Sequence, residues 1–281
     1  MELKFEMPPS GFKRLFFDIE TSFEIGKFWR PSFKAVIRHS DVLIDSAIIC
    51  ISYKWEGQKT VHSLRWDKGC DKILLEKFME VALKADEIIG HNGDNFDIKI
   101  VRTRCLFNGV PCPPKFQTLD TLKKARQFFR FDSNTLEYIS KKLTGDGKTP
   151  MVYEDWNLIC LPLIPKHLGY KVKLPKTYYS ALKKMVKYCE VDVIKLEEVF
   201  HHIQPYIEHN HHAGVKGGFG RYSCPKCGDD KPVIHAHRNT KSGTKRHTMR
   251  CIKNCGFFTI SNAVLMQKLK AELEEKIAGL N

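Results

Sequence analysis

Two acidic residues stand one position apart in the apolar segment RLFFDIETS, at Asp18 and Glu20. Successive side chains of a strand point to opposite faces, so these two carboxylates would share one face while Phe17 and Ile19 point to the other. Two ionised carboxylates at this spacing repel each other unless they lie near solvent or around a cation. The pair therefore predicts a divalent-metal site. A polar turn that simply ends the strand at Ile19 is the alternative.

Further acids occur at two distant places in the chain. In EIIGHNGDNFDIKIV a strand is expected to end before a polar turn, and Asp97 falls in the first turn of the following helix. Complementing the helix dipole is its alternative role, although Asp94 could serve that role by itself. In MVKYCEVDVIKL, Tyr188 and Asp192 are four residues apart and share one face of a predicted helix. Asp192 could equally lie on the solvent-exposed face of an ordinary amphipathic helix.

The elements expected to position these residues alternate between strands and helices. β-prone apolar runs predict strands at 14–19, 46–54, 59–65, 87–92 and 115–122. Helical periodicity is found at 71–85, from about 94 onward, at 134–143 and at 178–208. This order predicts an α/β fold with a mixed sheet flanked by helices.

The chain has 281 residues, which exceeds the usual size of one domain. The Gly-rich, apolar-poor stretch 209–223 is typical of a linker and contains part of a histidine cluster to which we assign no role. We predict a large domain over 1–212, a small basic domain over 213–260 and a terminal helix over 261–281. In that helix Leu265, Leu269, Leu273 and Ile277 recur every fourth residue. We expect this row to pack against its own domain, with docking to a partner as the alternative.

The net charge of +14 is concentrated in one short segment. Residues 213–260 hold ten Lys or Arg and two Asp, more than half of the excess. Such local charge favours a polyanionic partner, most simply nucleic acid. No apolar run is long enough for a membrane span and the N-terminal segment does not resemble a secretory signal, so we expect no membrane association and a cytoplasmic location.

The acidic motifs, in this order, resemble those of the DEDD superfamily of 3′–5′ exonucleases. Within it, the chain is most similar to the exonuclease domain of family B DNA polymerases and its free-standing phage and bacterial relatives. The likeness covers about residues 14–203 and rests on FFDIETS, IIGHNGDNFDIKIV, TLDTLKKARQFFRFDSNTLEYISKKL and MVKYCEVDV. Members with a histidine in the last motif carry it five residues before the final Asp. Here that position is Lys187, and Tyr188 marks the tyrosine subtype.

The resemblance implies a ribonuclease H-like fold, with the first three strands antiparallel, and two Mg²⁺ or Mn²⁺ ions. Hydrolysis of a phosphodiester profits from such ions, and oxygen ligands suit hard cations. Asp18 would bridge the two metals. Glu20 and Asp192 would complete the site for the nucleophilic water, and Asp97 would serve the second site partly through water. Tyr188 would orient the water, because a phenol with a pKa of about 10 is a poor general base.

Three further residues match positions that line the substrate groove in similar proteins. Asn92 and Asn134 would contact nucleic acid, although turn and capping roles explain them almost as well. Phe96 could stack on a terminal base, with core packing as the alternative. His91 is interpreted as structural.

Four of the ten cysteines form two paired motifs. In SCPKCG two residues separate Cys224 from Cys227, and in RCIKNCG three residues separate Cys251 from Cys255. Four thiolates suit tetrahedral Zn²⁺, and so polar a segment needs such a staple to fold. The pattern resembles zinc ribbons with a second knuckle one residue longer than usual, which leaves open whether Cys255 or a nearby His is the fourth ligand. Disulfides are the alternative. The other six cysteines are interpreted as buried free thiols.

Between the cysteine pairs, an alternating pattern around TKSGT predicts a β-hairpin. It carries five basic residues that would bind backbone phosphates: Arg238, Lys241, Lys245, Arg246 and Arg250. Solvated charges on a purely structural ribbon are the alternative. The histidines at 235, 237 and 247 are interpreted as hairpin side chains rather than ligands.

These features together predict a metal-dependent hydrolase that removes nucleotides from the 3′ ends of nucleic acid by a two-metal mechanism. DNA is the expected substrate, as in proofreading or repair, and a DNA polymerase or replication protein is the implied protein partner. An RNA-processing or structure-selective nuclease on the same fold is one alternative, because nothing in the sequence selects the 2′-hydroxyl. A non-catalytic nucleic-acid-binding or replisome adaptor is the other.

Overall fold

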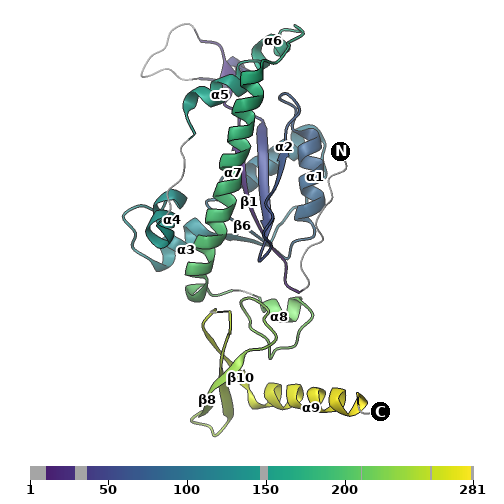
Figure 1. Ribbon diagram of the computed structural model, residues 1–281, viewed down its shortest axis with the longest axis vertical. Helices are drawn as coiled ribbons and strands as arrows, with labels where there is room; N and C mark the ends of the chain where they lie inside the picture. The colour runs from purple at the N-terminus through teal and green to yellow at the C-terminus, as the bar shows by residue number, and fades with distance from the viewer. Residues whose placement is uncertain (1–10, 29–36, 146–150, 210, 254, 280–281) are drawn as a thin grey trace. The chain divides into compact units, whose positions relative to one another are not determined.

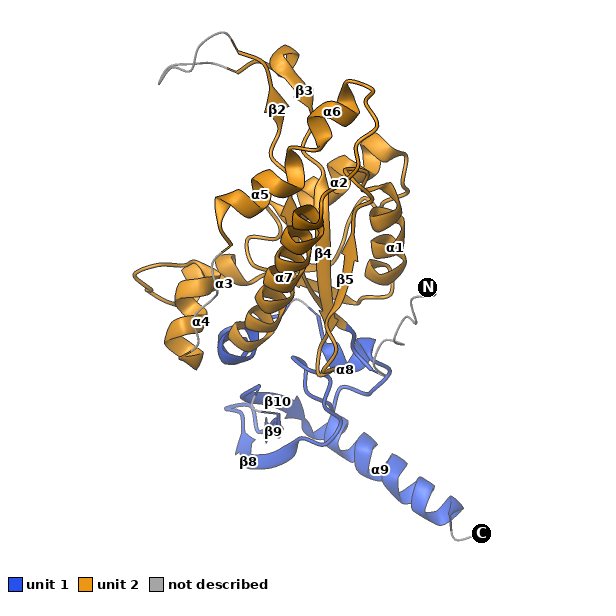
Figure 2. Ribbon diagram, turned by 45° about the horizontal axis from the view of Figure 1, so that its top comes forward, with its two compact units in different colours: residues 1–13, 200–281 blue, residues 14–199 orange. Residues whose placement is uncertain are grey.

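A computed structural model of the chain describes residues 11–28, 37–145, 151–209, 211–253 and 255–279. The chain forms two compact units, coloured orange and blue in Figure 2. We call residues 14–199 the sheet unit, and residues 1–13 with 200–281 the ribbon unit. The predicted boundary at 212/213, which follows composition, stays a prediction.

A five-stranded mixed sheet forms the centre of the sheet unit, in the order β5-β4-β1-β6-β7. Its strands are β1 (Arg14–Thr21), β4 (Ile48–Trp55), β5 (His62–Arg65), β6 (Glu87–Gly90) and β7 (Thr118–Asp120). The first three of these pair antiparallel, and β6 and β7 are parallel to β1. All five predicted strands are present, and the predicted α/β fold with a mixed sheet is confirmed.

Helices cover both faces of this sheet, which is why β4 is buried along its whole length. One face packs on α1 (Lys72–Ala82) and α2 (Asp97–Asn108), and the other packs on the long helix α7 (Lys176–Ile203), which crosses the sheet in Figure 1. The remaining helices of the unit are α3 (Thr121–Phe128), α4 (Leu136–Thr144), α5 (Tyr153–Cys160) and α6 (Leu163–His167). The α3 and α4 helices pack near Val199, at the end of α7.

Several small elements were not predicted. The two-stranded pair β2 (Ile25–Gly26) and β3 (Val42–Ile44) has no run of β-prone residues long enough to show in sequence. The 3-10 turn η1 (His39–Asp41) directly precedes β3. The α3, α5 and α6 helices, of eight, eight and five residues, were not predicted either. None of these elements contributes a predicted site residue.

The ribbon unit is built on a three-stranded antiparallel sheet in the order β10-β9-β8. The strands are β8 (Val233–Asn239), β9 (Lys245–Arg250) and β10 (Phe257–Ser261), so the predicted hairpin is present and has a third strand. The unit also contains η2 (Gln204–Tyr206), α8 (Ala213–Lys216) and α9 (Asn262–Ala278), the last capped by Ser261.

The terminal helix departs from the expectation that its apolar row packs against its own domain. Leu265 is buried against Met249 and Ile260. Leu269, Leu273 and Ile277 are each about half exposed. The expectation was wrong for these three because only the first turns of α9 reach the short three-stranded sheet. No helix among the described residues combines the length and apolar character needed to cross a membrane.

Candidate functional site

The first strand presents its two acids on one face. Phe17 and Ile19 belong to the core packed against α1 and α2, so Asp18 and Glu20 point to the opposite face, on which α7 packs. The register with β4 shifts just after Glu20, at a β-bulge. Bulges are common next to active sites, where they redirect side chains at a strand end.

Helix α7 supplies the third acid of the site. Its apolar positions, including Met185 and Cys189, are buried against the sheet, and this packing turns Asp192 inward with only 4% of its surface exposed. Oxygen atoms of Asp18, Glu20 and Asp192 all lie within 4.8 Å of one another. Three carboxylates at such short separations can together ligate a divalent cation.

The clustering of acids has a clear electrostatic consequence. The pKa of Asp18 is raised well above its ordinary value, first by burial and then by the charges of Asp97, Asp192 and Glu20. Without a cation the cluster therefore resists ionisation, and a divalent ion would relieve this repulsion. The donor set thus fits the Mg²⁺ or Mn²⁺ that the sequence implied.

Asp97 lies beside this group but makes a different contact. It is the first residue of α2, it is buried, and its Oδ1 accepts a hydrogen bond from the backbone N–H of Ile19 at 3.3 Å. Burial raises the pKa of Asp97 to about 7 despite that hydrogen bond. Asp97 therefore joins the start of α2 to the acidic segment of β1. Asp97 is also the acidic residue in the first turn of α2, as its dipole alternative requires, whereas Asp94 precedes the helix and pairs with Lys123 at 2.7 Å.

Tyr188 is half-buried on α7, one turn before Asp192. The α-helical spacing places the two side chains on the same face of the helix. Its contact with a water molecule stays a prediction.

A buried carboxylate that the sequence interpretation did not single out supports the loop before α2. Asp120 caps α3 and accepts hydrogen bonds from Leu122 N at 3.0 Å and Asn92 N at 2.9 Å. Asn92 has a left-handed backbone, with φ of 65°, so its turn role is shown. The available signal was an Asp directly before TLKKARQF, a segment that was not predicted to be helical because a strand was expected over 115–122.

His91 connects the same loop to the segment before α4. Its Nδ1 lies 2.9 Å from Thr121 Oγ1, and its Nε2 lies 2.9 Å from the carbonyl oxygen of Asn134, to which it donates. This agrees with a structural role for His91. Thr135 rather than Asn134 caps α4, so the capping alternative for Asn134 was wrong. The Asn134 Oδ1 is buried and no described residue provides it a hydrogen bond.

The ring of Phe96 is 44% exposed at the start of α2. The core-packing alternative is therefore wrong for this residue. An exposed ring two residues after Asp94 and one before Asp97 is available for stacking, and that role stays a prediction.

Cys189 is a second residue whose position the sequence did not reveal. Its Sγ lies 3.3 Å from the Asp18 carbonyl oxygen and 3.4 Å from Asp18 Oδ2, and it donates a weak hydrogen bond there. This thiol is buried and touches Asp18, one of the three acids that could together hold a divalent cation. Only the packing of α7 on β1 brings the two residues together, so sequence offered no signal.

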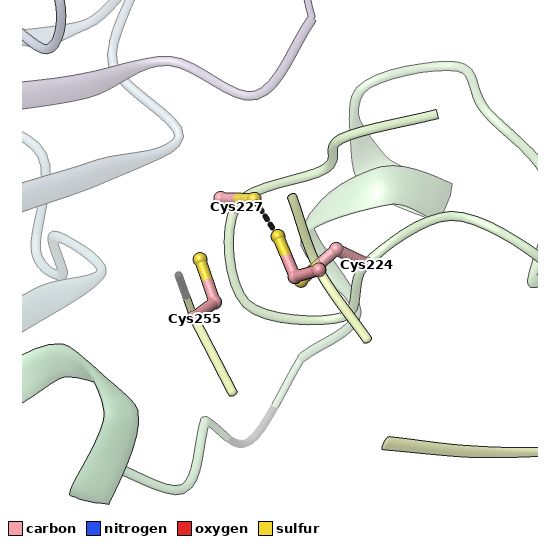
Figure 3. A group of neighbouring side chains, drawn as sticks. Cys224, Cys227 and Cys255 are labelled. Carbon is pink, nitrogen blue, oxygen red and sulfur yellow. Dashed lines mark hydrogen bonds between the residues drawn. The ribbon is translucent and has the colours of Figure 1, made fainter. Parts of the chain in front are cut away.

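In the ribbon unit, the four paired cysteines converge. Sulfur atoms of Cys224, Cys227, Cys251 and Cys255 all lie within 4.8 Å of one another. Figure 3 shows the thiols of Cys224, Cys227 and Cys255 directed toward a common centre. Each pair is followed by a glycine with a left-handed backbone, Gly228 at φ 77° and Gly256 at φ 94°, which allows the tight turn around a bound ion.

The cysteine cluster can now be compared with two alternatives, disulfide bonds and a histidine as the fourth ligand. All ten cysteines are free, so no disulfide is present. Cys255 supplies the fourth thiol, while His237 and His247 contact each other through their Nδ1 atoms at 2.7 Å. Contacts among the four thiols lower the pKa of Cys224 and raise the pKa values of Cys227 and Cys255. The donor set fits Zn²⁺.

The five basic residues predicted to bind phosphates are all exposed: Arg238, Lys241, Lys245, Arg246 and Arg250. Four of them lie on β8 and β9, and Lys241 lies in the turn between these strands. Their contact with nucleic acid stays a prediction.

One protein-family model matches a part of the sheet unit. Residues 44–158 match the family model described as RNase_H superfamily, so this segment is an RNase_H-superfamily domain. The matched segment contains Asp97 but neither the acids of β1 nor those of α7.

A family B DNA polymerase from the hyperthermophilic archaeon Pyrobaculum calidifontis is similar in structure. The TM-score is 0.41 and the sequence identity is 16%, over 82% of this chain and 32% of the polymerase. The chain therefore spans about a third of that protein's length. No curated protein matches the sequence.

Proposed function

We propose that the chain is a metal-dependent 3′–5′ exonuclease that hydrolyses phosphodiester bonds at the 3′ ends of DNA. The observation that carries the proposal is the convergence of Asp18, Glu20 and Asp192 within 4.8 Å on the α7 side of the sheet. The RNase_H-superfamily domain supports a nuclease, and the motif order with Tyr188 supports the 3′–5′ direction.

Four acids would hold two Mg²⁺ or Mn²⁺ ions: Asp18, Glu20, Asp97 and Asp192. When bound, such ions make water more acidic and stabilise the charge that develops on the scissile phosphate. Tyr188 would donate a hydrogen bond that orients the water, and Asp97 would hold the start of α2 against β1 through Ile19 N. Phe96 would stack on the terminal base.

The ribbon unit would contribute nucleic-acid binding. Zn²⁺ held by its four cysteines would order the sheet that carries the basic residues, because a polar segment of this size lacks a sufficient core. Arg and Lys side chains would bind backbone phosphates without sequence preference.

The direct test is degradation of single-stranded DNA and RNA of the same sequence, labelled at the 5′ end, in Mg²⁺ or Mn²⁺. We expect a ladder of products shortened from the 3′ end, formed faster on DNA. Asp18→Ala should reduce the rate by more than about 100-fold, since even partners that only support a metal ligand contribute 10–100-fold. Glu198→Ala, at a half-exposed acid of α7 that pairs with Lys195, is the control and should retain the rate.

The other outcomes separate the alternatives. Faster degradation of RNA would favour an RNA-processing enzyme, and internal cuts at junctions would favour a structure-selective nuclease. Binding with no degradation in either metal would contradict the proposal and favour an adaptor.

A further inference from the structure

The strand register of the ribbon sheet sorts its side chains onto two different faces. His247, Met249 and Ile260 are buried on the inner face, where Leu265 of α9 covers the last two. The opposite face, which we call the outer face, carries exposed and half-exposed residues: Val233, Ala236, Arg238, Arg246, Thr248, Arg250, Phe257, Thr259 and Ser261. His235, at the register shift between Ile234 and Ala236, joins this face through its ring contact with Phe257. A sheet with one buried face normally carries scattered polar groups on the other.

The outer face is positively charged, and no acidic residue of the three strands neutralises this charge. Residues 233–261 contain six Lys or Arg and no Asp or Glu. Arg238 on β8 lies directly opposite Arg246 on β9. Like charges in this position destabilise a sheet, and a bound anion would reverse that effect. The arrangement favours a polyanion.

Beside the arginines lies an exposed aromatic pair. The rings of His235 and Phe257 are 4.7 Å apart between centroids, at an angle of 50°. They come from the two outer strands and meet above β9, where Phe257 is paired in register with Arg250. Phe257 is 55% exposed, so its ring is accessible to a ligand. A flat apolar ring next to guanidinium groups matches the two halves of a nucleotide, base and phosphate.

We propose that the outer face is a binding site for single-stranded nucleic acid. One unpaired base stacks on the Phe257–His235 pair, and the three arginines bind phosphates of the same strand. A duplex fits less well because its bases are already stacked and offer no free face. An acidic peptide would satisfy the arginines and leave the aromatic pair without a function. The inference rests on the proposed nucleic-acid substrate and adds which form is bound and by which residues.

The test measures equilibrium binding of a fluorescent single-stranded 20-mer to the full zinc-loaded chain at several salt concentrations. Every protein carries Asp18→Ala, so that the strand is not degraded and the result is independent of the nuclease assay. Phe257→Ala is compared with Leu269→Ala, which removes an apolar side chain of similar exposure (49%) on α9. Arg246→Ala is compared with Lys270→Ala, also on α9. Zinc content of each variant reports whether the ribbon is intact.

The two classes of variant should behave differently. Phe257→Ala should weaken binding by about 5- to 100-fold with an unchanged salt dependence, because stacking is not ionic. Arg246→Ala should lower the slope of log K against log salt by about 0.7, the value for one phosphate of a single strand. Both α9 controls should bind as the parent does. In a second measurement, the indole introduced by Phe257→Trp should lose fluorescence when the strand binds.

Three results would overturn the proposal. The first is parental affinity of Phe257→Ala combined with an unquenched Phe257→Trp. The second is equal affinity for the duplex of the same sequence. The third is equal affinity for a polyglutamate of matched charge, which would assign the face to acidic proteins.

Discussion

The thiol of Cys189 on α7 lies 3.4 Å from Oδ2 of Asp18 on β1 and donates a hydrogen bond to it. The contact joins the helix that carries Asp192 to the strand that carries the first two acids. Under the proposed function Asp18 would be a metal ligand, and its orientation would then affect the whole site.

We expect Cys189→Ala to weaken metal binding more than catalysis at saturating metal. The Mn²⁺ concentration for half-maximal rate should rise by about 10-fold, at the lower end of effects for groups that support a ligand, and excess Mn²⁺ should restore most of the rate. Metal titrations of the initial rate measure this. Cys160→Ala removes another buried thiol of the same core and should leave the titration unchanged. A parental midpoint for Cys189→Ala would show that the contact does not orient Asp18.

The raised pKa of Asp97 predicts a pH-dependent stability without divalent metal. Burial raises this pKa from 3.8 to about 7, so the folded chain holds a proton over that range that the unfolded chain has released. The contribution of Asp97 to stability is therefore present below about pH 4 and is lost as pH rises to about 7. Asp97→Asn should gain stability relative to the parent over this window.

The measurement is the midpoint of thermal unfolding of both proteins from pH 4 to 8, in buffer that keeps zinc and omits Mg²⁺ and Mn²⁺. Adding Mn²⁺ should stabilise the parent more at high pH, because binding requires the ionised carboxylates. A difference between the two proteins that does not vary with pH would contradict the assignment.

Two variants at Asn92 distinguish the requirement for its backbone conformation from a function of its side chain. Its φ of 65° suits glycine, so Asn92→Gly should leave the free energy of unfolding nearly unchanged. Asn92→Ala should cost about 1–2 kcal/mol, the usual penalty for a left-handed residue. If the amide contacts the substrate, both variants should lose activity to the same extent. Denaturant unfolding and DNA degradation, measured together, test this, and full activity of Asn92→Gly would assign the residue to the turn alone.

The cysteine cluster predicts one zinc ion per chain and a ribbon that depends on it. Cys224→Ser should lose the ion and, with it, the amide-exchange protection of residues 233–261. Residues 48–55 of β4 should keep their protection, because they belong to the separate core of the sheet unit. Cys70→Ser is the control, because this thiol is exposed, contrary to its interpretation as a buried one. Retained zinc at one equivalent in Cys224→Ser would exclude this residue as a ligand.

The parts of the fold that sequence predicted are those that local patterns determine. Strands β1 and β4 are continuous β-prone runs, and the cysteine spacing is imposed by tetrahedral coordination itself. Strands β2 and β3 were missed because two or three residues form no period.

Contacts between distant elements were not accessible from sequence. The motifs placed Asp97 among the acids, but its hydrogen bond to Ile19 depends on how α2 meets β1. The same holds for Cys189, which sequence could describe only as a buried thiol. The apolar row of α9 was misinterpreted because periodicity shows that a face exists and says nothing about what covers it.

The central claim is that carboxylates from β1 and α7 bind divalent metal together. Crystals of the full chain soaked in Mn²⁺, with anomalous diffraction recorded at the manganese edge, test it most directly. We predict anomalous peaks within coordination distance of Asp18, Glu20 and Asp192, and their loss in Asp18→Ala. A parent protein whose acidic cluster holds no manganese at millimolar concentration near neutral pH would contradict the account.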